Sequence, residues 1–108
     1  MSSFKDFKNL DIRLAKVLEC KSIPDSKSLI ELKIDIGDNQ THTIVAAIKE
    51  WYSPEELIGE YVLIALNLQL NNLKSEGFLL AIDAENSAVL LKPDKKYIDK
   101  IKPGMKLA

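Results

Sequence analysis

The fold follows from the stretch Ile30-Glu31-Leu32-Lys33-Ile34-Asp35-Ile36, in which apolar and charged residues alternate one by one. A period of two is that of a strand with one buried and one exposed face. The turn signal Gly37-Asp38-Asn39 follows at once and leads into a second strand-like run over residues 41–48. The two runs therefore predict a β-hairpin.

The segment upstream of this hairpin changes phase along its length. Ile12 and Leu14 would point to one face of a flat strand, whereas Val17 would point to the other. A bulge near Ala15 and Lys16 would let the strand bend and bury all three, as strands do at the corners of small barrels. We therefore expect a bent first strand.

A short helix is predicted after the hairpin. Ser53-Pro54-Glu55-Glu56 combines a capping residue, a first-turn proline and a glutamate that can bond back to the cap. Gly59 can end this helix after barely two turns. Apolar runs over residues 61–66 and 77–82 then predict two more strands, and a third run over residues 88–91 precedes a charged tail.

These elements contain no βαβ alternation, which favours a small antiparallel barrel. We predict an all-β OB-fold, a five-stranded antiparallel barrel with one short helix between strands 3 and 4 and a C-terminal extension. The size of 108 residues predicts a single domain over residues 1–108. The short apolar runs, and an N-terminus without a charged-then-apolar leader, predict a soluble, unexported, cytoplasmic protein.

Sequence signatures of catalysis are missing. The chain has one Cys and one His, and it contains no P-loop, His-Glu-x-x-His or Gly-x-Ser-x-Gly motif. We therefore expect no enzyme activity, no catalytic residue, no metal site and no cofactor. Fifteen Lys and Arg against sixteen Asp and Glu give a net charge of -1. Any nucleic-acid site would then need a local basic patch.

Several blocks resemble one known family. They are, in order along the chain, Leu10-Asp11-Ile12-Arg13, Leu32-Lys33-Ile34-Asp35-Ile36-Gly37, Tyr52-Ser53-Pro54-Glu55-Glu56-Leu57-Ile58-Gly59, Lys74-Ser75-Glu76-Gly77 and the closing Pro103-Gly104-Met105-Lys106. They are similar to the tRNA-binding domain of methionyl-tRNA synthetases, to its counterparts in the tyrosyl enzyme and endothelial monocyte-activating polypeptide of animals, and to small free-standing relatives.

The resemblance implies a non-catalytic module that binds the outer corner of tRNA through its backbone and shape. Such a module is free-standing or acts in trans with an aminoacyl-tRNA synthetase. Free-standing members are homodimers, which implies an interface here around residues 4–10 and 89–107. The resemblance and the distribution of cations together predict RNA-binding residues, namely Lys27, Lys33, His42, Lys49, Lys74 and Ser75.

The chain departs from the family pattern in three places. Residues 23–29 lack the family's His and Asn, and residues 42–48 replace its Arg and Ser by His42 and Ala46. The loop between Asn67 and Lys74 is short and uncharged, whereas the family commonly carries a basic pair there. Arg grips phosphate with two parallel hydrogen bonds, so its loss weakens the predicted RNA surface.

For Lys33 and Arg13 a purely structural role is an alternative to RNA binding. Lys33 lies between Glu31 and Asp35 and is equally consistent with a solvated strand position. For Arg13 we favour an ion pair with Asp11 or Glu76 over a phosphate contact.

The alternative function is a protein-binding or peptide-binding, chaperone-like dimer on the same fold with reduced RNA binding. Ala46 and Ala47 would then line an apolar pocket. The shortened loop over residues 23–28 also resembles that branch of the family.

Overall fold

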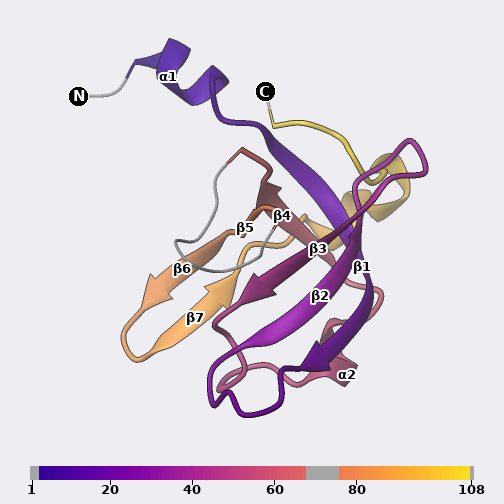
Figure 1. The fold of residues 1–108 in the computed structure, drawn as a ribbon. Coiled ribbons are helices and arrows are strands. Elements are labelled where there is room, and N and C mark those ends of the chain that lie inside the picture. Colours follow the sequence, from indigo (N-terminus) through magenta and orange to yellow (C-terminus); the bar gives the residue numbers. More distant parts are fainter. Residues whose placement is uncertain (1–2, 68–75, 108) are drawn as a thin grey trace.

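The computed structural model describes residues 3–67 and 76–107. Five antiparallel strands form the main sheet in the order β3-β2-β1-β4-β5, and contacts between β3 and β5 nearly close it into a barrel (Figure 1). The strands are β1 (Ile12–Ser22), β2 (Ile30–Asp35), β3 (Thr41–Ala46), β4 (Tyr61–Ala65) and β5 (Phe78–Leu79). This architecture confirms the predicted fold, including the hairpin of β2 and β3.

The first strand bends around the barrel, as predicted, but its irregularity lies further along. The register of β1 against β2 shifts between Val17 and Glu19, not near Ala15 and Lys16. Leu14 and Ala15 are neighbours that are both buried, at 6% and 0% exposure. Because both faces of this half of β1 are covered, the strand needs no bulge between them. The extra residue comes where β1 leaves β4 and continues along β2 alone.

A short helix, α2 (Pro54–Leu57), lies between β3 and β4 as predicted. The backbone N–H and the hydroxyl of Ser53 both donate to the Glu56 carboxylate, at 3.0 and 2.9 Å. Leu57 is fully buried and brings the helix into the barrel core. The largest fully buried side chains of that core are Val17, Ile30, Leu32, Ile34, Ile44, Leu57, Val62 and Ile64.

The strand predicted over residues 77–82 is not continuous. Only Phe78 and Leu79 pair with β4, whereas β6 (Ala81–Ala84) pairs with β7 (Ser87–Leu90) in a separate two-stranded sheet. A local turn explains the change of partner, because Asn86 adopts a left-handed φ of 61° and folds β7 back onto β6.

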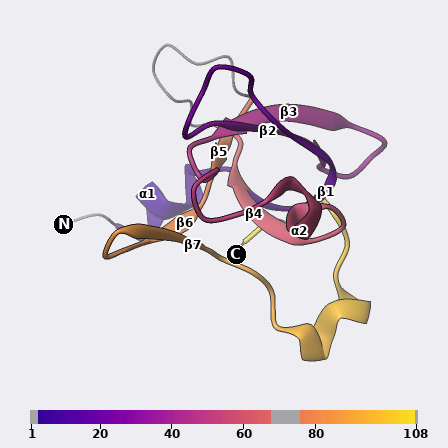
Figure 2. The same ribbon diagram turned by 90° about the horizontal axis from the view of Figure 1, so that it is seen from below.

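Both ends of the chain add short elements. The helix α1 (Phe4–Lys8), which the sequence pattern did not predict, begins at a Ser3–Asp6 capping box. The 3₁₀ helix η1 (Lys95–Lys100) precedes a segment that returns along β1, where Leu14 donates to the carbonyl of Met105 at 2.8 Å. Figures 1 and 2 show α1 and the β6–β7 hairpin on one side of the barrel and η1 on the other.

No helix in the described residues combines the length and apolar character needed to span a membrane.

Candidate nucleic-acid interface

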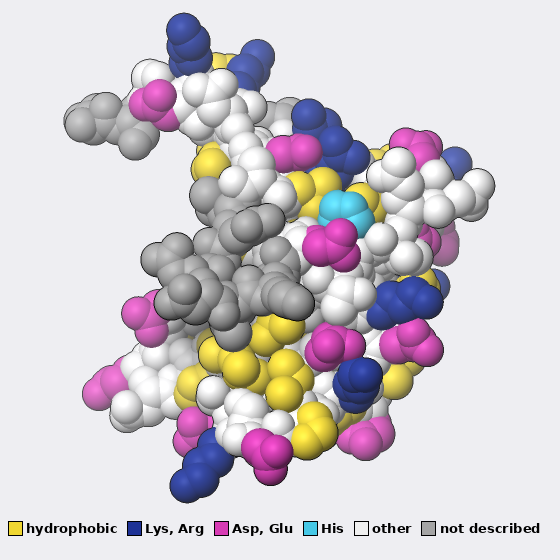
Figure 3. All heavy atoms as spheres, in the orientation of Figure 1, with side chains coloured by type: hydrophobic (Ala, Val, Ile, Leu, Met, Phe, Trp, Pro, Cys, Tyr) yellow, Lys and Arg dark blue, Asp and Glu magenta, His cyan; other side chains and the backbone are white. Residues whose placement is uncertain are grey.

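The outer face of β1, β2 and β3 carries a shallow groove of about 280 Å³. Its charged side chains neutralise one another. Lys33 Nζ lies 3.5 Å from Glu19 Oε2, and Lys21 Nζ lies 3.5 Å from Glu31 Oε1. The side chain of the predicted contact residue Lys33 is 48% exposed, but its charge is already paired with that of Glu19. In Figure 3 dark-blue and magenta side chains are interspersed over the side where β2 and β3 lie.

The loop over residues 23–29 joins β1 to β2, contains the predicted contact Lys27 and is bound by a second predicted contact, Lys49. Ser26 organises the loop, because its hydroxyl accepts from the N–H groups of Ser28 and Leu29. Lys49 holds the same loop from outside, with its Nζ donating to the Ser26 carbonyl at 2.7 Å. Lys27 is exposed at the tip. Of this pair, Lys27 is therefore placed to reach a ligand and Lys49 to fix the loop.

His42 and Glu76 meet at the open edge of β3. The His42 Nδ1 atom lies 3.1 Å from the Glu76 carbonyl, so the tautomer protonated at Nδ1 donates this bond. The N–H of Thr43 donates to the Glu76 carboxylate at 2.8 Å, and the Glu76 N–H donates to the Thr43 carbonyl. A carboxylate thus borders the predicted RNA surface. The predicted contacts Lys74 and Ser75 lie outside the described residues.

The strand register separates two of the predicted contacts. Lys33 pairs with Thr43, and Ile34 pairs with His42. Directly opposed residues of an antiparallel pair share a face, so His42 shares the face of the buried Ile34, while Lys33 lies on the outer face. The structure therefore does not gather Lys33 and His42 at one point. The alternation of apolar and charged residues over positions 30–36 already indicated that Lys33 lies on the outer face.

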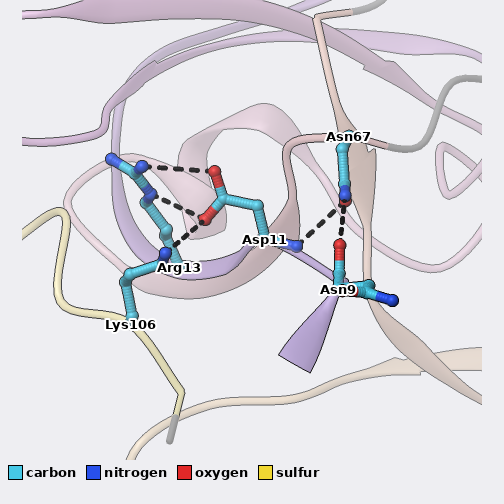
Figure 4. Close-up of polar contacts among 5 residues, drawn as sticks. All are labelled: Asn9, Asp11, Arg13, Asn67 and Lys106. Atoms are coloured by element: carbon cyan, nitrogen blue, oxygen red, sulfur yellow. Dashed lines mark hydrogen bonds and ion pairs between the residues drawn. The ribbon is translucent and has the colours of Figure 1, made fainter. Parts of the chain in front are cut away.

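A polar network ties the start of β1 to both ends of the chain (Figure 4). Arg13 donates to the two oxygens of Asp11 at 2.9 and 3.2 Å, and Lys106 Nζ lies 3.7 Å from the same carboxylate. The hydrogen bonds from Arg13 lower the pKa of Asp11 below its ordinary value, with the nearby charges of Arg13 and Lys106 acting in the same direction. Asn67 accepts from the Asp11 N–H and donates to the Asn9 carbonyl. The predicted structural role of Arg13 is confirmed.

An apolar depression of about 220 Å³ lies between the end of β3 and the β6–β7 hairpin. Its lining includes Ala46, Ala47, Phe78 and Ala88. Figure 3 shows hydrophobic side chains gathered where the ends of β3 and β7 meet. This position matches the apolar pocket predicted at Ala46 and Ala47, and it contains no ionisable side chain among the described residues that line it.

Comparisons with known proteins agree on one family. The family model described as “Putative tRNA binding domain” matches residues 12–104. The methionine–tRNA ligase of Pyrococcus horikoshii is 42% identical over 96 residues, which are 86% of this chain and 13% of the ligase. The chain thus spans about an eighth of the length of that curated relative.

Two solved structures share the whole fold. A crystal structure of the chaperone CsaA from Bacillus anthracis superposes with a TM-score of 0.81 at 29% identity, and the match covers 100% of this chain and 99% of the other. The CsaA chaperone protein from Picrophilus torridus gives a TM-score of 0.84 at 28% identity, with 100% of each chain covered. The similar proteins therefore include both enzyme-borne domains and chaperones.

Proposed function

The chain belongs to the tRNA-binding domain family, and from that membership we propose that it is a non-catalytic module that binds tRNA. The observation that carries this proposal is the family match over residues 12–104, which spans the whole barrel. We further propose that the module works in the cytoplasm, free-standing or in trans with an aminoacyl-tRNA synthetase.

The proposed RNA surface is the groove on β1, β2 and β3, together with the adjoining loop over residues 23–29. Lys27 supplies an exposed cation, and Lys33 adds a second once phosphate competes for it with Glu19. Lys49 acts by holding the loop, and His42 borders the surface at the edge of β3. Lys74 and Ser75 complete the proposed contact set.

Binding of bulk tRNA at ~50 mM and ~200 mM salt tests this function. A protein that contacts several phosphates loses orders of magnitude in affinity over that range, because binding releases condensed counterions. We expect such a fall, and a further loss in a Lys27→Glu/Lys74→Glu variant. A Lys27→Arg/Lys74→Arg variant keeps the charges and should bind like the original chain. Absence of binding at ~50 mM salt would contradict the proposal.

Peptide binding is the second candidate, and the apolar depression beside Ala47 favours it. A cavity lined by small apolar groups suits an apolar side chain of a partner better than it suits phosphate. Ala47 is exposed at its edge, so Ala47→Asp would place a charge there without opening the core. If this candidate is right, Ala47→Asp weakens binding of an apolar peptide and leaves tRNA binding unchanged.

A homodimer through the terminal segments is the third part of the proposal. Phe4 and Phe7 on α1 are 65% and 37% exposed, and Met105 and Leu107 near the C-terminus are 44% and 40% exposed. Neighbouring apolar side chains left open to water mark interaction surfaces. Sedimentation of a Phe4→Glu/Phe7→Glu variant should show a monomer. Ile58→Glu, at a site 51% exposed on another face, is the matched control and should stay dimeric.

A further inference from the structure

The charges of the chain are divided unevenly between residues 92–106 and the rest of the sequence. Residues 92–106 carry six Lys and two Asp, whereas the remaining residues carry nine Lys and Arg and fourteen Asp and Glu. The near-neutral total therefore hides a basic C-terminal segment on an acidic body. Because RNA affinity depends on local rather than total charge, this segment is the strongest electrostatic candidate in the chain.

We propose that the η1 surface, defined as Lys16, Lys95, Lys96, Tyr97, Lys100 and Lys102, is the main phosphate-binding surface for RNA. This inference rests on the proposed tRNA-binding function and names the part of the molecule that supplies its electrostatic affinity. The groove on β1, β2 and β3, where Lys21 and Lys33 are paired with glutamates, then supplies the smaller part of the electrostatic affinity.

The lysines of η1 are available to a ligand. No ion pair within residues 3–67 and 76–107 involves Lys95, Lys96 or Lys100. All three are exposed, and their helix follows Asp94, whose carboxylate is occupied in accepting the Lys96 N–H at 2.9 Å. The groove differs, because its two lysines each lie 3.5 Å from a glutamate.

Tyr97 gives this surface an aromatic centre. Tyr97 is 47% exposed, and the ammonium groups of Lys96 and Lys100 lie 5.0 and 5.6 Å from its ring centroid. An exposed aromatic ring flanked by cations is the combination with which proteins bind the backbone and the bases of RNA together. The two lysines can contact phosphates, and the exposed part of the tyrosine can contact a base beside them.

A cavity of about 380 Å³ connects η1 to the barrel. Lys16 of β1 and Lys95 of η1 both line it, together with Tyr61. Its acidic members are Asp99 and Glu60, and Glu60 is already bound by Lys92 at 2.8 Å. The cavity thus gathers cations from two distant parts of the sequence.

The η1 surface lies far from the loop over residues 23–29 in both views of the ribbon (Figures 1 and 2). It also lies away from α1 and the β6–β7 hairpin. A large folded RNA would therefore contact η1 and the groove with different stretches of its backbone.

Two charge-reversed variants of the full chain test this inference against bulk tRNA. Lys96→Glu/Lys100→Glu alters η1, and Lys27→Glu/Lys33→Glu alters the groove with the same change in net charge. We expect the η1 variant to lose about tenfold or more in affinity at ~100 mM salt, with the slope of log K against log salt reduced by about 2. The groove variant should lose less. A Lys96→Gln/Lys100→Gln variant, which only removes charge, should show a smaller loss in the same direction.

The outcomes distinguish a failure of the η1 inference from a failure of the proposed tRNA-binding function. If the original chain binds tRNA and the η1 variant binds equally well, the inference is wrong and the proposed function stands. Equal losses in both variants also contradict the inference, because a general effect of net charge would then be sufficient. If the original chain binds no tRNA at ~50 mM salt, both the proposed function and the inference fail.

Discussion

Gly37 and Gly104 face each other so closely that neither position has room for a side chain. A Cβ on Gly104 would lie 2.5 Å from the Ile36 carbonyl oxygen and 3.2 Å from the Gly37 Cα. A Cβ on Gly37 would lie 2.6 Å from the Pro103 carbonyl oxygen. This contact fixes the C-terminal segment against the turn between β2 and β3, and so it helps to position the η1 surface beside the barrel.

Gly104→Ala should therefore destabilise the protein strongly. The φ of Gly104 is +93°, a strained value for alanine, and the new methyl group would also clash with backbone. We expect the free energy of unfolding to fall by about 3 kcal/mol. Gly59→Ala is the matched control, because its φ is +85° but no atom lies within 4 Å of the added Cβ. That control should lose only about 1 kcal/mol in urea denaturation, and equal losses would rule out the close contact as the cause.

Leu57 should contribute far more to stability than its neighbour Ile58. Leu57 is 0% exposed and belongs to the core cluster, whereas Ile58 is 51% exposed. Leu57→Ala leaves a cavity in the barrel and should cost roughly 2–5 kcal/mol. Ile58→Ala should stay within about 0.5 kcal/mol of the original chain. Similar costs for the two substitutions, measured by denaturant unfolding, would show that α2 is not anchored through Leu57.

The Asp11–Arg13 pair should make stability depend on pH in the acid range. The pKa of Asp11 in the folded state is lowered, mainly by the hydrogen bonds from Arg13. As the pH falls, the Asp11 carboxylate is therefore protonated at a higher pH in the unfolded state than in the folded state. The resulting stabilisation is complete above the ordinary Asp pKa of about 3.9. It is lost as the pH falls through the lowered folded value. Unfolding curves of Asp11→Asn should show a flatter loss of stability with acid, and an unchanged slope would exclude this pair as its source.

Local signals made much of the fold predictable from the sequence. The alternation over residues 30–36 and the turn after it define a hairpin, and Ser53 with Glu56 defines the start of α2, because each pattern depends on residues close together in the chain. The break after Leu79 was not predictable in the same way. An apolar run looks the same whether it keeps one partner strand or changes to another.

The candidate site was less predictable because its charges pair across strands. The sequence places Lys33 between Glu31 and Asp35, but its ionic partner is Glu19 of β1, which the register brings opposite it. The apolar pocket predicted at Ala46 and Ala47 was found. Small side chains at the end of a strand leave a hollow beside any element that packs against that end. The role that we propose for the basic residues 92–102 was not predicted from the sequence, because the near-neutral total charge conceals their local excess of lysine.

Glu19 should restrain RNA binding in the groove, and its removal should strengthen it. Its carboxylate lies 3.5 Å from Lys33 Nζ and is 73% exposed, so Glu19→Gln frees a lysine without disturbing the core. Because each additional phosphate contact adds about 0.9 to the salt slope, we expect tRNA affinity at ~50 mM salt to rise about threefold to tenfold with a steeper slope. Glu85→Gln changes net charge equally at an exposed site between β6 and β7, and it should leave affinity nearly unchanged. Equal gains in the two variants would point to total charge, and no gain in Glu19→Gln would mean that Lys33 does not face the RNA.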